Sequence, residues 1–307
     1  MNPSDEPHEH SHGHSHGPAA FDRAFAVGIA LNIVFVAIEA FYGWRATSLA
    51  LLADAGHNLS DVAGLALAWV AALAGRLPPD QRHTYGWQRA SILAAFANAI
   101  LLLVVMGSLI WEAVHRLQSP TPIAGVTVMV VAAVGVVVNG ATAALFMAGR
   151  ASDMNIRGAF LHMAADALVS LGVVAAGALY LWAGWLWLDP VVSIVIALVI
   201  IVGTWSLLAQ SLHLLFDGVP EGVDFGAVDA WLRRQPGVCE VHDLHIWAMS
   251  TTEIALTAHL VMPAGHPGDA FFEDLAKALR ARFNIAHPTL QVEIAGCDHG
   301  CVAPKPV

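Results

Sequence analysis

Two identical spacings of metal-binding residue types stand inside long apolar stretches of this sequence. His57 and Asp61 are four residues apart, and His162 and Asp166 repeat that separation. Residues i and i+4 share one face of an α-helix, so each pair is predicted to direct an imidazole and a carboxylate the same way. Ionisable groups within a membrane are costly and face a cavity or a partner. Four such ligands match the coordination number of tetrahedral Zn²⁺, which predicts a divalent-metal site inside a membrane.

A simpler alternative is that the two pairs are buried His–Asp ion pairs that only join helices. Hydrogen bonding between helices does not require the same spacing twice, so the repeat favours the metal site. Asp54 lies on the same predicted helix face as His57 and is interpreted as a partner for an imidazole or as an ion-path residue. The other polar residues of the apolar segments are interpreted as helix–helix hydrogen bonds: Asn32, Glu39, Glu112 and Asn139.

The composition predicts an integral membrane protein. Of the 307 residues, 57% are hydrophobic and only 12% are charged, which is too few charges for the surface of a soluble domain of this size. The net charge of −10 gives no indication of nucleic acid as a partner. The residues after Phe216 carry 12 acidic and 6 basic side chains, which suits either a cation-handling aqueous domain or an ordinary solvated surface.

Six apolar segments are long enough to cross a hydrocarbon core of ~30 Å, which takes ~20 helical residues. We expect membrane helices at about residues 21–43, 48–74, 88–116, 121–147, 154–183 and 188–214. An even number of spans places both termini on one side. Six arginines fall at one set of helix ends and two at the other, so the positive-inside rule predicts that both termini are cytoplasmic.

The pattern changes near Asp217 to that of a small water-soluble domain. We expect a helix at 223–234, strands at 238–249 and 253–262, a second helix at 269–283 and a third strand at 289–294. This order predicts an α+β layer with helices on one face of a sheet. The expected divisions are a disordered arm (1–20), a six-helix transmembrane domain (21–215), a cytoplasmic α+β domain (216–296) and a Cys/His tail (297–307).

The two ends of the chain are rich in potential metal ligands. Five histidines alternate with Glu, Ser and Gly in residues 1–20, which is interpreted either as a loose metal-collecting arm or as an inert tail. The three cysteines, Cys239, Cys297 and Cys301, do not form a disulfide framework, so we expect a reducing, cytoplasmic environment for them. Cys297 and Cys301 are a plausible thiolate pair for Zn²⁺.

Four sequence strings together resemble the cation diffusion facilitator family, of the bacterial zinc and cadmium efflux type. The strings are Ala53-Asp54-Ala55-Gly56-His57 to Asp61, His83-Thr84-Tyr85-Gly86-Trp87-Gln88-Arg89, His162 to Asp166, and Val241-His242-Asp243-Leu244-His245-Ile246-Trp247. The resemblance covers nearly the whole chain. It implies a homodimer in the lipid bilayer that exchanges cytoplasmic Zn²⁺ for protons, with His57, Asp61, His162 and Asp166 as transport ligands. Histidine in both pairs resembles the zinc-preferring pattern, with Cd²⁺ as a plausible second substrate.

The resemblance also implies sites outside the membrane. The C-terminal domain resembles a metallochaperone-like (ferredoxin-like) fold whose regulatory or structural metal positions match His242, His259, His287 and Glu293. Because residues i and i+3 of a strand point to opposite sides, we expect at most one of His242 and His245 to join a given site. Asp80 and His83 match a variable loop site, although Trp87 stands where some members have another histidine. Arg89 and Asp217 match a salt bridge between the membrane and cytoplasmic parts.

These features predict a proton-coupled metal antiporter rather than an enzyme. Metal and protons compete for the same imidazole and carboxylate atoms, and the sequence has no P-loop that would indicate ATP as the energy source. The alternatives are a metal sensor without flux, suggested by the Cys/His tail, and a membrane metalloenzyme, for which Asp54 is the one candidate base. The absence of a long His-rich loop between the fourth and fifth segments favours a bacterial inner membrane.

Overall fold

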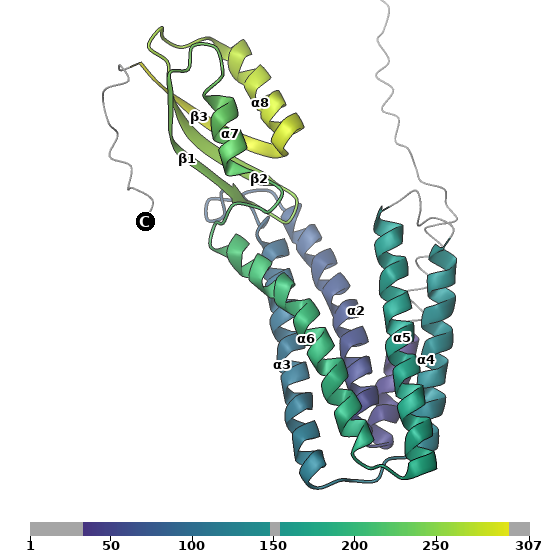
Figure 1. The fold of residues 1–307 in the computed structure, drawn as a ribbon. Helices are drawn as coiled ribbons and strands as arrows, with labels where there is room; N and C mark the ends of the chain where they lie inside the picture. The colour runs from purple at the N-terminus through teal and green to yellow at the C-terminus, as the bar shows by residue number, and fades with distance from the viewer. Residues whose placement is uncertain (1–32, 148–153, 295–307) are drawn as a thin grey trace, which may run out of the picture. The chain divides into compact units, whose positions relative to one another are not determined.

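A computed structural model describes residues 33–147 and 154–294 (Figure 1). The chain divides into two compact units, one of Met1–Asn58 with Ser119–Val192 and the other of Leu59–Gln118 with Ser193–Val307. Helix α2 (Leu49–Gly75) begins in the first unit and continues into the second, and so does helix α6 (Leu188–Leu215). The His-rich arm and the Cys/His tail lie outside the described residues.

Four helices of the described chain are long and apolar enough to cross a membrane. They are α3 (Ala90–Gln118), most of α4 (Gly125–Phe146), most of α5 (Met154–Ala183) and α6. Residues 33–45 and α2 are also helical but are not among these four. The expected total of six spans is therefore not confirmed, and part of the first expected segment, 21–43, lies outside the described residues.

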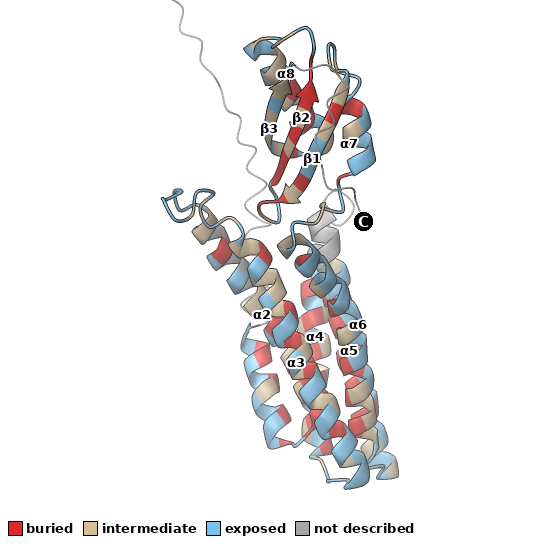
Figure 2. Ribbon diagram, turned by 90° about the vertical axis from the view of Figure 1, so that its left-hand side faces the viewer, coloured by how far each residue is buried: buried red, intermediate tan, exposed pale blue. Residues whose placement is uncertain are grey.

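Large apolar side chains remain exposed along the long helices (Figure 2). Leu168 is 69% exposed and Val202 is 75% exposed. Exposing this much apolar surface to water would be unfavourable. A lipid-facing surface removes that cost, because the hydrocarbon core is itself apolar. The protein is an integral membrane protein.

Helices α4 and α5 pack along each other within the first unit. Gly135 on α4 permits close approach, because a Cβ atom there would lie 2.7 Å from the Phe35 ring and 3.0 Å from the Ser170 hydroxyl oxygen. Because Gly135 has no side chain, α4 can pack closely against both α5 and the helix of residues 33–45 at the level of Ser170. This level is one helical turn beyond Asp166, one of the predicted ligands.

A buried carboxylate caps the N-terminus of α2. Asp189, at the start of α6, is 4% exposed and accepts hydrogen bonds from the Ser48 hydroxyl, from the Leu49 N–H (2.9 Å) and from the Ala50 N–H (3.4 Å). The first N–H groups of a helix have no partner within the helix, and negative charge is favourable there. Asp189 therefore fixes the start of the helix that carries His57 and Asp61.

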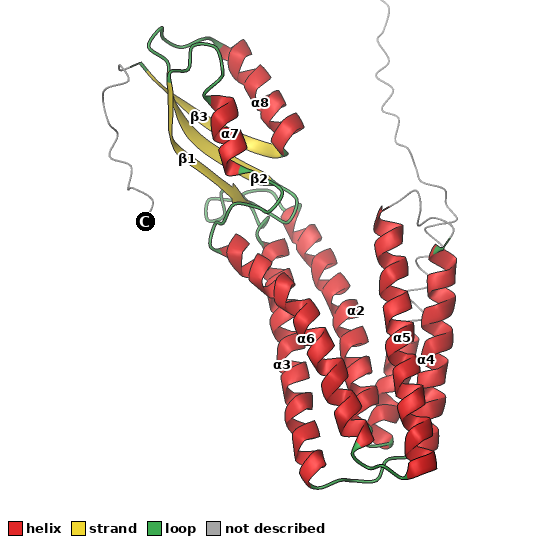
Figure 3. Cartoon of the chain, in the orientation of Figure 1, coloured by secondary structure: helices red, strands yellow, loops and turns green. Residues whose placement is uncertain are grey.

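The second unit includes a small α/β domain. Its elements are α7 (Phe225–Leu232), β1 (Glu240–Ala248), β2 (Ile254–Val261), α8 (Asp269–Phe283) and β3 (Ile285–Glu293) (Figure 3). The sheet order is β1-β2-β3, with β1 antiparallel and β3 parallel to β2. The predicted order of elements is confirmed, but β3 begins four residues before the expected Thr289 because residues from Ile285 onward already pair with β2.

One face of this sheet forms the core of the domain. Alternate residues of β2, Leu256, Ala258 and Leu260, are buried together with Leu232 of α7 and Leu279 of α8. Side chains alternate between the two faces of a strand. Both helices therefore cover one face, and His259 lies on the opposite face.

The cap at Asp189 generates a stability prediction. Asp189→Ala leaves the N–H groups of α2 and the Ser48 hydroxyl without their acceptor, which costs about 1–3 kcal/mol. We expect a lower thermal midpoint of the purified protein in detergent, and a non-additive loss when Ser48→Ala is combined with it, because the two residues share one hydrogen bond. Glu112→Ala, which breaks the i,i+4 ion pair of Glu112 with Arg116, is the control and is expected to change the midpoint little. An equal loss from both variants would contradict the cap.

Candidate metal sites

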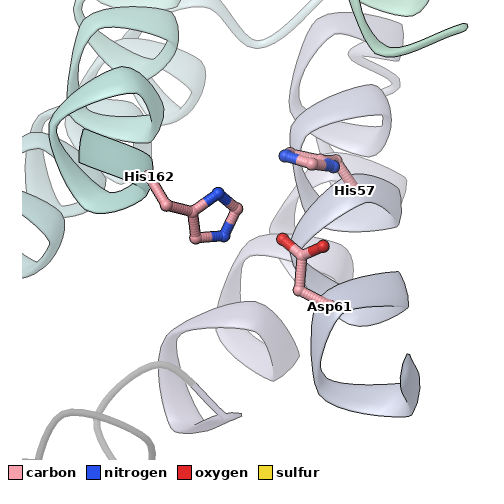
Figure 4. Close-up of side chains that lie close together, drawn as sticks. All are labelled: His57, Asp61 and His162. Carbon is pink, nitrogen blue, oxygen red and sulfur yellow. The ribbon is translucent and has the colours of Figure 1, made fainter. Parts of the chain in front are cut away.

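The two predicted His–Asp pairs come together in the structure. His57 and Asp61 lie on α2, and His162 approaches them from α5 (Figure 4). One ligand atom from each of these three residues lies within 4.8 Å of the other two. The rings of His57 and His162 are 5.8 Å apart and nearly perpendicular, at 77°. A single ion can therefore be reached from both helices.

Asp166 joins the two histidines. Its carboxylate lies 3.7 Å from Nε2 of His57 and 3.6 Å from Nε2 of His162, and the residue is only 3% exposed. Ligand atoms about 2.0–2.2 Å from a tetrahedral ion are separated by roughly 3.4 Å. The two separations from Asp166 are close to this value, although Asp166 is not in the group of His57, Asp61 and His162 whose ligand atoms all lie within 4.8 Å of one another.

A second group of potential ligands lies on the sheet face that the helices leave open. It consists of His242 on β1, His259 on β2 and Glu293 at the end of β3. Glu293 lies 3.1 Å from Nε2 of His242 and 2.9 Å from Nδ1 of His259, and strand pairing sets His242 opposite His259. Two imidazoles and one carboxylate form a ligand set that Zn²⁺ accepts.

The histidines affect the acidity of Glu293. Partial burial raises the pKa of its carboxyl group, but hydrogen bonds from His242 and His259 favour the carboxylate, and the pKa is lowered overall. The carboxylate is therefore ionised at neutral pH, which is the state that binds a metal.

A bulge in β1 explains how His242 and His245 face the same side. His242 pairs with His259, and His245 pairs with Thr257, so the two intervening residues of β1 oppose the single intervening residue of β2. Asp243 occupies the bulge with a φ of 51°. The expectation that the two histidines point to opposite faces is therefore wrong, because the extra residue shifts the alternation of side chains. His245 nevertheless lies beside Asp243, at 3.0 Å, and not in the His242 group.

Asp243 is a residue of this face that the sequence analysis did not select. Its carboxylate is 3.6 Å from Nε2 of His259, and the hydrogen bond from His245 lowers its pKa. Its position next to His242 in the sequence could have indicated a role for Asp243. In a regular strand, however, Asp243 would point to the face opposite that of His242.

The remaining predicted site residues lie elsewhere. His287 is 3.3 Å from Glu253 and is not part of the His242 group. Asp80 accepts N–H bonds from Arg82 and His83 in a tight turn, which lowers the pKa of Asp80, and the His83 ring lies 4.2 Å from the Trp87 ring. The predicted salt bridge is present within the second unit, where the Arg89 guanidinium donates to the Asp217 carboxylate. Cys297 and Cys301 lie outside the described residues.

Two protein-family models match the chain. The cation efflux transmembrane domain matches residues 25–216, and the cation efflux protein cytoplasmic domain matches residues 220–295. The chain belongs to the cation efflux family. Members of this family that resemble it along most of their length carry names that refer to metal efflux or transport.

Three curated relatives illustrate the similarity. The chain is 37% identical to the metal cation efflux system protein CzcD of Cupriavidus metallidurans, over 92% of this chain and 90% of that protein. It is 36% identical to the zinc transporter ZitB of Escherichia coli, over 90% and 88% of the two chains. It is 32% identical to the cadmium, cobalt and zinc/H(+)-K(+) antiporter of Bacillus subtilis, over 86% of each.

Among solved structures, the metal-bound C-terminal domain of the CzcD transporter from Cupriavidus metallidurans is similar to part of this chain. The sequence identity is 38%, over a segment that makes up 23% of this chain. The match covers 99% of that domain with a TM-score of 0.22.

The geometry predicts two separable metal sites. In the purified full-length protein, His162→Ala is expected to lose about one equivalent of bound Zn²⁺ from the membrane site, and Glu293→Gln about one equivalent from the cytoplasmic site. The two losses are expected to add in the double variant, because the two sites share no ligand. Equilibrium dialysis with metal analysis measures both. Glu253→Gln is the matched control, since its carboxylate contacts His287 and lies outside the His242 group. Identical Zn²⁺ content in the wild type and Glu293→Gln would contradict the cytoplasmic site.

Proposed function

We propose that this integral membrane transporter carries Zn²⁺, and also Cd²⁺, out of the cytoplasm in exchange for protons. The substrate ion binds His57, Asp61, His162 and Asp166. The observation that supports this assignment is the meeting of two His–Asp pairs from α2 and α5, with carboxylate-to-imidazole separations of 3.6 and 3.7 Å. The printed names of the relatives, which include zinc, cadmium and an H(+)-coupled antiporter, agree with it.

Proton coupling follows from the chemistry of the ligands. A metal needs neutral imidazole and ionised carboxylate, whereas acid protonates the same atoms. An imidazole titrates near pH 6.5 in water, between cytoplasmic pH and an acidic exterior. Zn²⁺ therefore displaces protons from His57 and His162 on the cytoplasmic side, and protons displace Zn²⁺ on the other side.

The proposal includes the organisation of the molecule. The chain is a homodimer with six membrane helices (residues 21–215), and both termini lie on the cytoplasmic side of a bacterial inner membrane. Residues 216–296 form a ferredoxin-like, metallochaperone-like domain, in which His242, His259 and Glu293 bind a regulatory or structural Zn²⁺. The arm of residues 1–20 contributes five histidines as accessory metal ligands. The tail from 297 to 307 offers Cys297 and Cys301 as further ligands.

Transport in proteoliposomes tests the proposed function. Wild-type protein is expected to move Zn²⁺ toward a trapped fluorescent indicator when a pH step is imposed, and Asp166→Asn is expected to abolish this flux because it removes the carboxylate between both histidines. His115→Ala is the control, since the described contacts of His115 are with the carbonyl and the ring of Trp111 on its own helix. Binding without flux in the wild type would indicate the alternative, a membrane metal sensor. Flux that is unchanged with the proton gradient collapsed would contradict proton coupling.

The histidine in the first pair is predicted to set selectivity. His57→Asp replaces a nitrogen ligand with a harder oxygen ligand. We expect the Zn²⁺ preference over Cd²⁺ to decrease, measured as the ratio of the two initial fluxes in the same proteoliposomes. An unchanged ratio would mean that residues other than His57 set selectivity.

A further inference from the structure

Four polar side chains form a buried network in the first unit, beside the membrane metal site. Glu39 on the helix of residues 33–45, Asn58 on α2 and Ser170 on α5 are 0% exposed, and Asp54 on α2 is 1% exposed. Two of the four carry carboxyl groups, and no lysine or arginine is among them. Burying a carboxylate away from water costs several kcal/mol unless it is paired or protonated. The network therefore needs a source of positive charge.

The contacts show where that charge is required. The carboxyl groups of Glu39 and Asp54 lie within reach of a hydrogen bond to each other. Ser170 Oγ donates to Asp54 Oδ2 at 3.0 Å, and Asn58 Nδ2 donates to Glu39 Oε2 at 3.3 Å. Ionised carboxylates only accept hydrogen bonds, so a bond between two of them requires a proton on one. Glu39 Oε1 is buried without a hydrogen-bond partner in the described part of the chain, which leaves this oxygen available for a proton.

We propose that Glu39 and Asp54 form a proton-binding site, which holds one shared proton and releases it when a divalent metal occupies the neighbouring His–Asp site. The first part of this proposal stands on the contacts of the pair. The second part rests on the proposed function, because it assumes that the His–Asp site binds the transported ion.

The position of the pair links it to the metal ligands on both helices. Asp54 precedes His57 by three residues on α2, and Ser170 follows Asp166 by four residues on α5, so both lie about one helical turn from a ligand. Two hydrogen bonds of the pair come from Ser170 and Asn58, which are not among the four ligands. The pair can therefore exchange its proton without losing or gaining a bond to the metal.

Electrostatics gives the direction of the coupling. The ionisable groups that act on the pair are Asp166 on α5 and His57 on α2, and α4 carries no ionisable side chain. Without a metal, burial and the negative charge of Asp166 favour retention of the proton between Glu39 and Asp54, and His57 acts on Asp54 in the opposite direction. A bound Zn²⁺ neutralises that charge and brings two positive charges nearby, which favours release.

This proposal differs from a role for Glu39 as a helix–helix hydrogen bond. A glutamine at position 39 would satisfy Asn58 and Asp54 equally well, because its amide both donates and accepts. If Glu39 acts only as a bridge, Glu39→Gln preserves function. If it holds a proton, the same variant removes a proton that is released with metal binding.

Infrared difference spectroscopy of the purified full-length protein tests the site itself. A protonated carboxylic acid has a C=O stretch that is separate from that of a carboxylate and shifts in D₂O. We expect this band in the metal-free wild type at neutral pH, its loss on addition of Zn²⁺, and its loss or shift in Glu39→Gln and Asp54→Asn. Glu112→Gln, which changes a half-exposed carboxylate on α3, is the control and keeps the band. The wild-type measurement needs no variant to fold, and absence of the band there overturns the proposal.

Counting protons separates this proposal from the proposed function. Glu39→Gln is expected to release about one proton fewer per Zn²⁺ bound than the wild type, in weakly buffered solution with a pH indicator. If wild-type Zn²⁺ flux is proton-coupled but Glu39→Gln keeps both the wild-type count and the infrared band, the Glu39–Asp54 site is wrong and the transport function stands. If Glu39→Gln loses the infrared band but wild-type Zn²⁺ flux is independent of the proton gradient, the Glu39–Asp54 site stands and proton coupling of transport is wrong.

Discussion

The cost of placing ionisable groups in an apolar environment controls the structure of this protein. His57, Asp61, His162 and Asp166 can stand on membrane helices only if each finds a partner, because an isolated charge there costs several kcal/mol. The helical period supplies the partners: a four-residue spacing brings a histidine and an aspartate to one face of α2 and repeats the arrangement on α5. The separations of 3.6 and 3.7 Å from Asp166 to the two histidines show that the helices meet at these faces. An ion that enters between them replaces these contacts with stronger ones of the same geometry.

The surrounding elements keep these two faces in register. Asp189 holds the first turn of α2 through backbone N–H groups and Ser48, about two turns before His57. The bare backbone at Gly135 lets α4 approach α5 at Ser170, one turn beyond Asp166. Both features are compatible with an apolar environment. The carboxylate of Asp189 is hydrogen-bonded to a helix N-terminus, and Gly135 has no side chain. The positions of the ligands therefore depend on contacts at neighbouring turns, not only on the ligands themselves.

Sequence alone predicted the features that follow from local periodicity. The i,i+4 rule selected the His–Asp pairs that come together between α2 and α5, and the pattern of apolar residues predicted the order α-β-β-α-β after Asp217. Features that depend on pairing between distant segments were less accessible. The bulge at Asp243 reversed the expected directions of His242 and His245, because one extra residue in a strand turns every later side chain to the other face. The cap at Asp189 joins residues 140 positions apart, and nothing in the local sequence indicates its donors.

The same distinction explains why Glu39 and Asp54 looked ordinary in the sequence. Each is a single acidic residue in its own apolar segment, and a lone acid in a membrane helix is compatible with a simple hydrogen bond to a neighbour. Their meaning changes when the fold brings the two carboxyl groups together, with Ser170 and Asn58 as their donors in the described part of the chain. Burial and the nearness of two carboxyl groups both disfavour the doubly ionised state, so a proton on one of them is favoured. A proton-binding site therefore lies beside a cation-binding site. This is the arrangement that exchange of protons for cations requires.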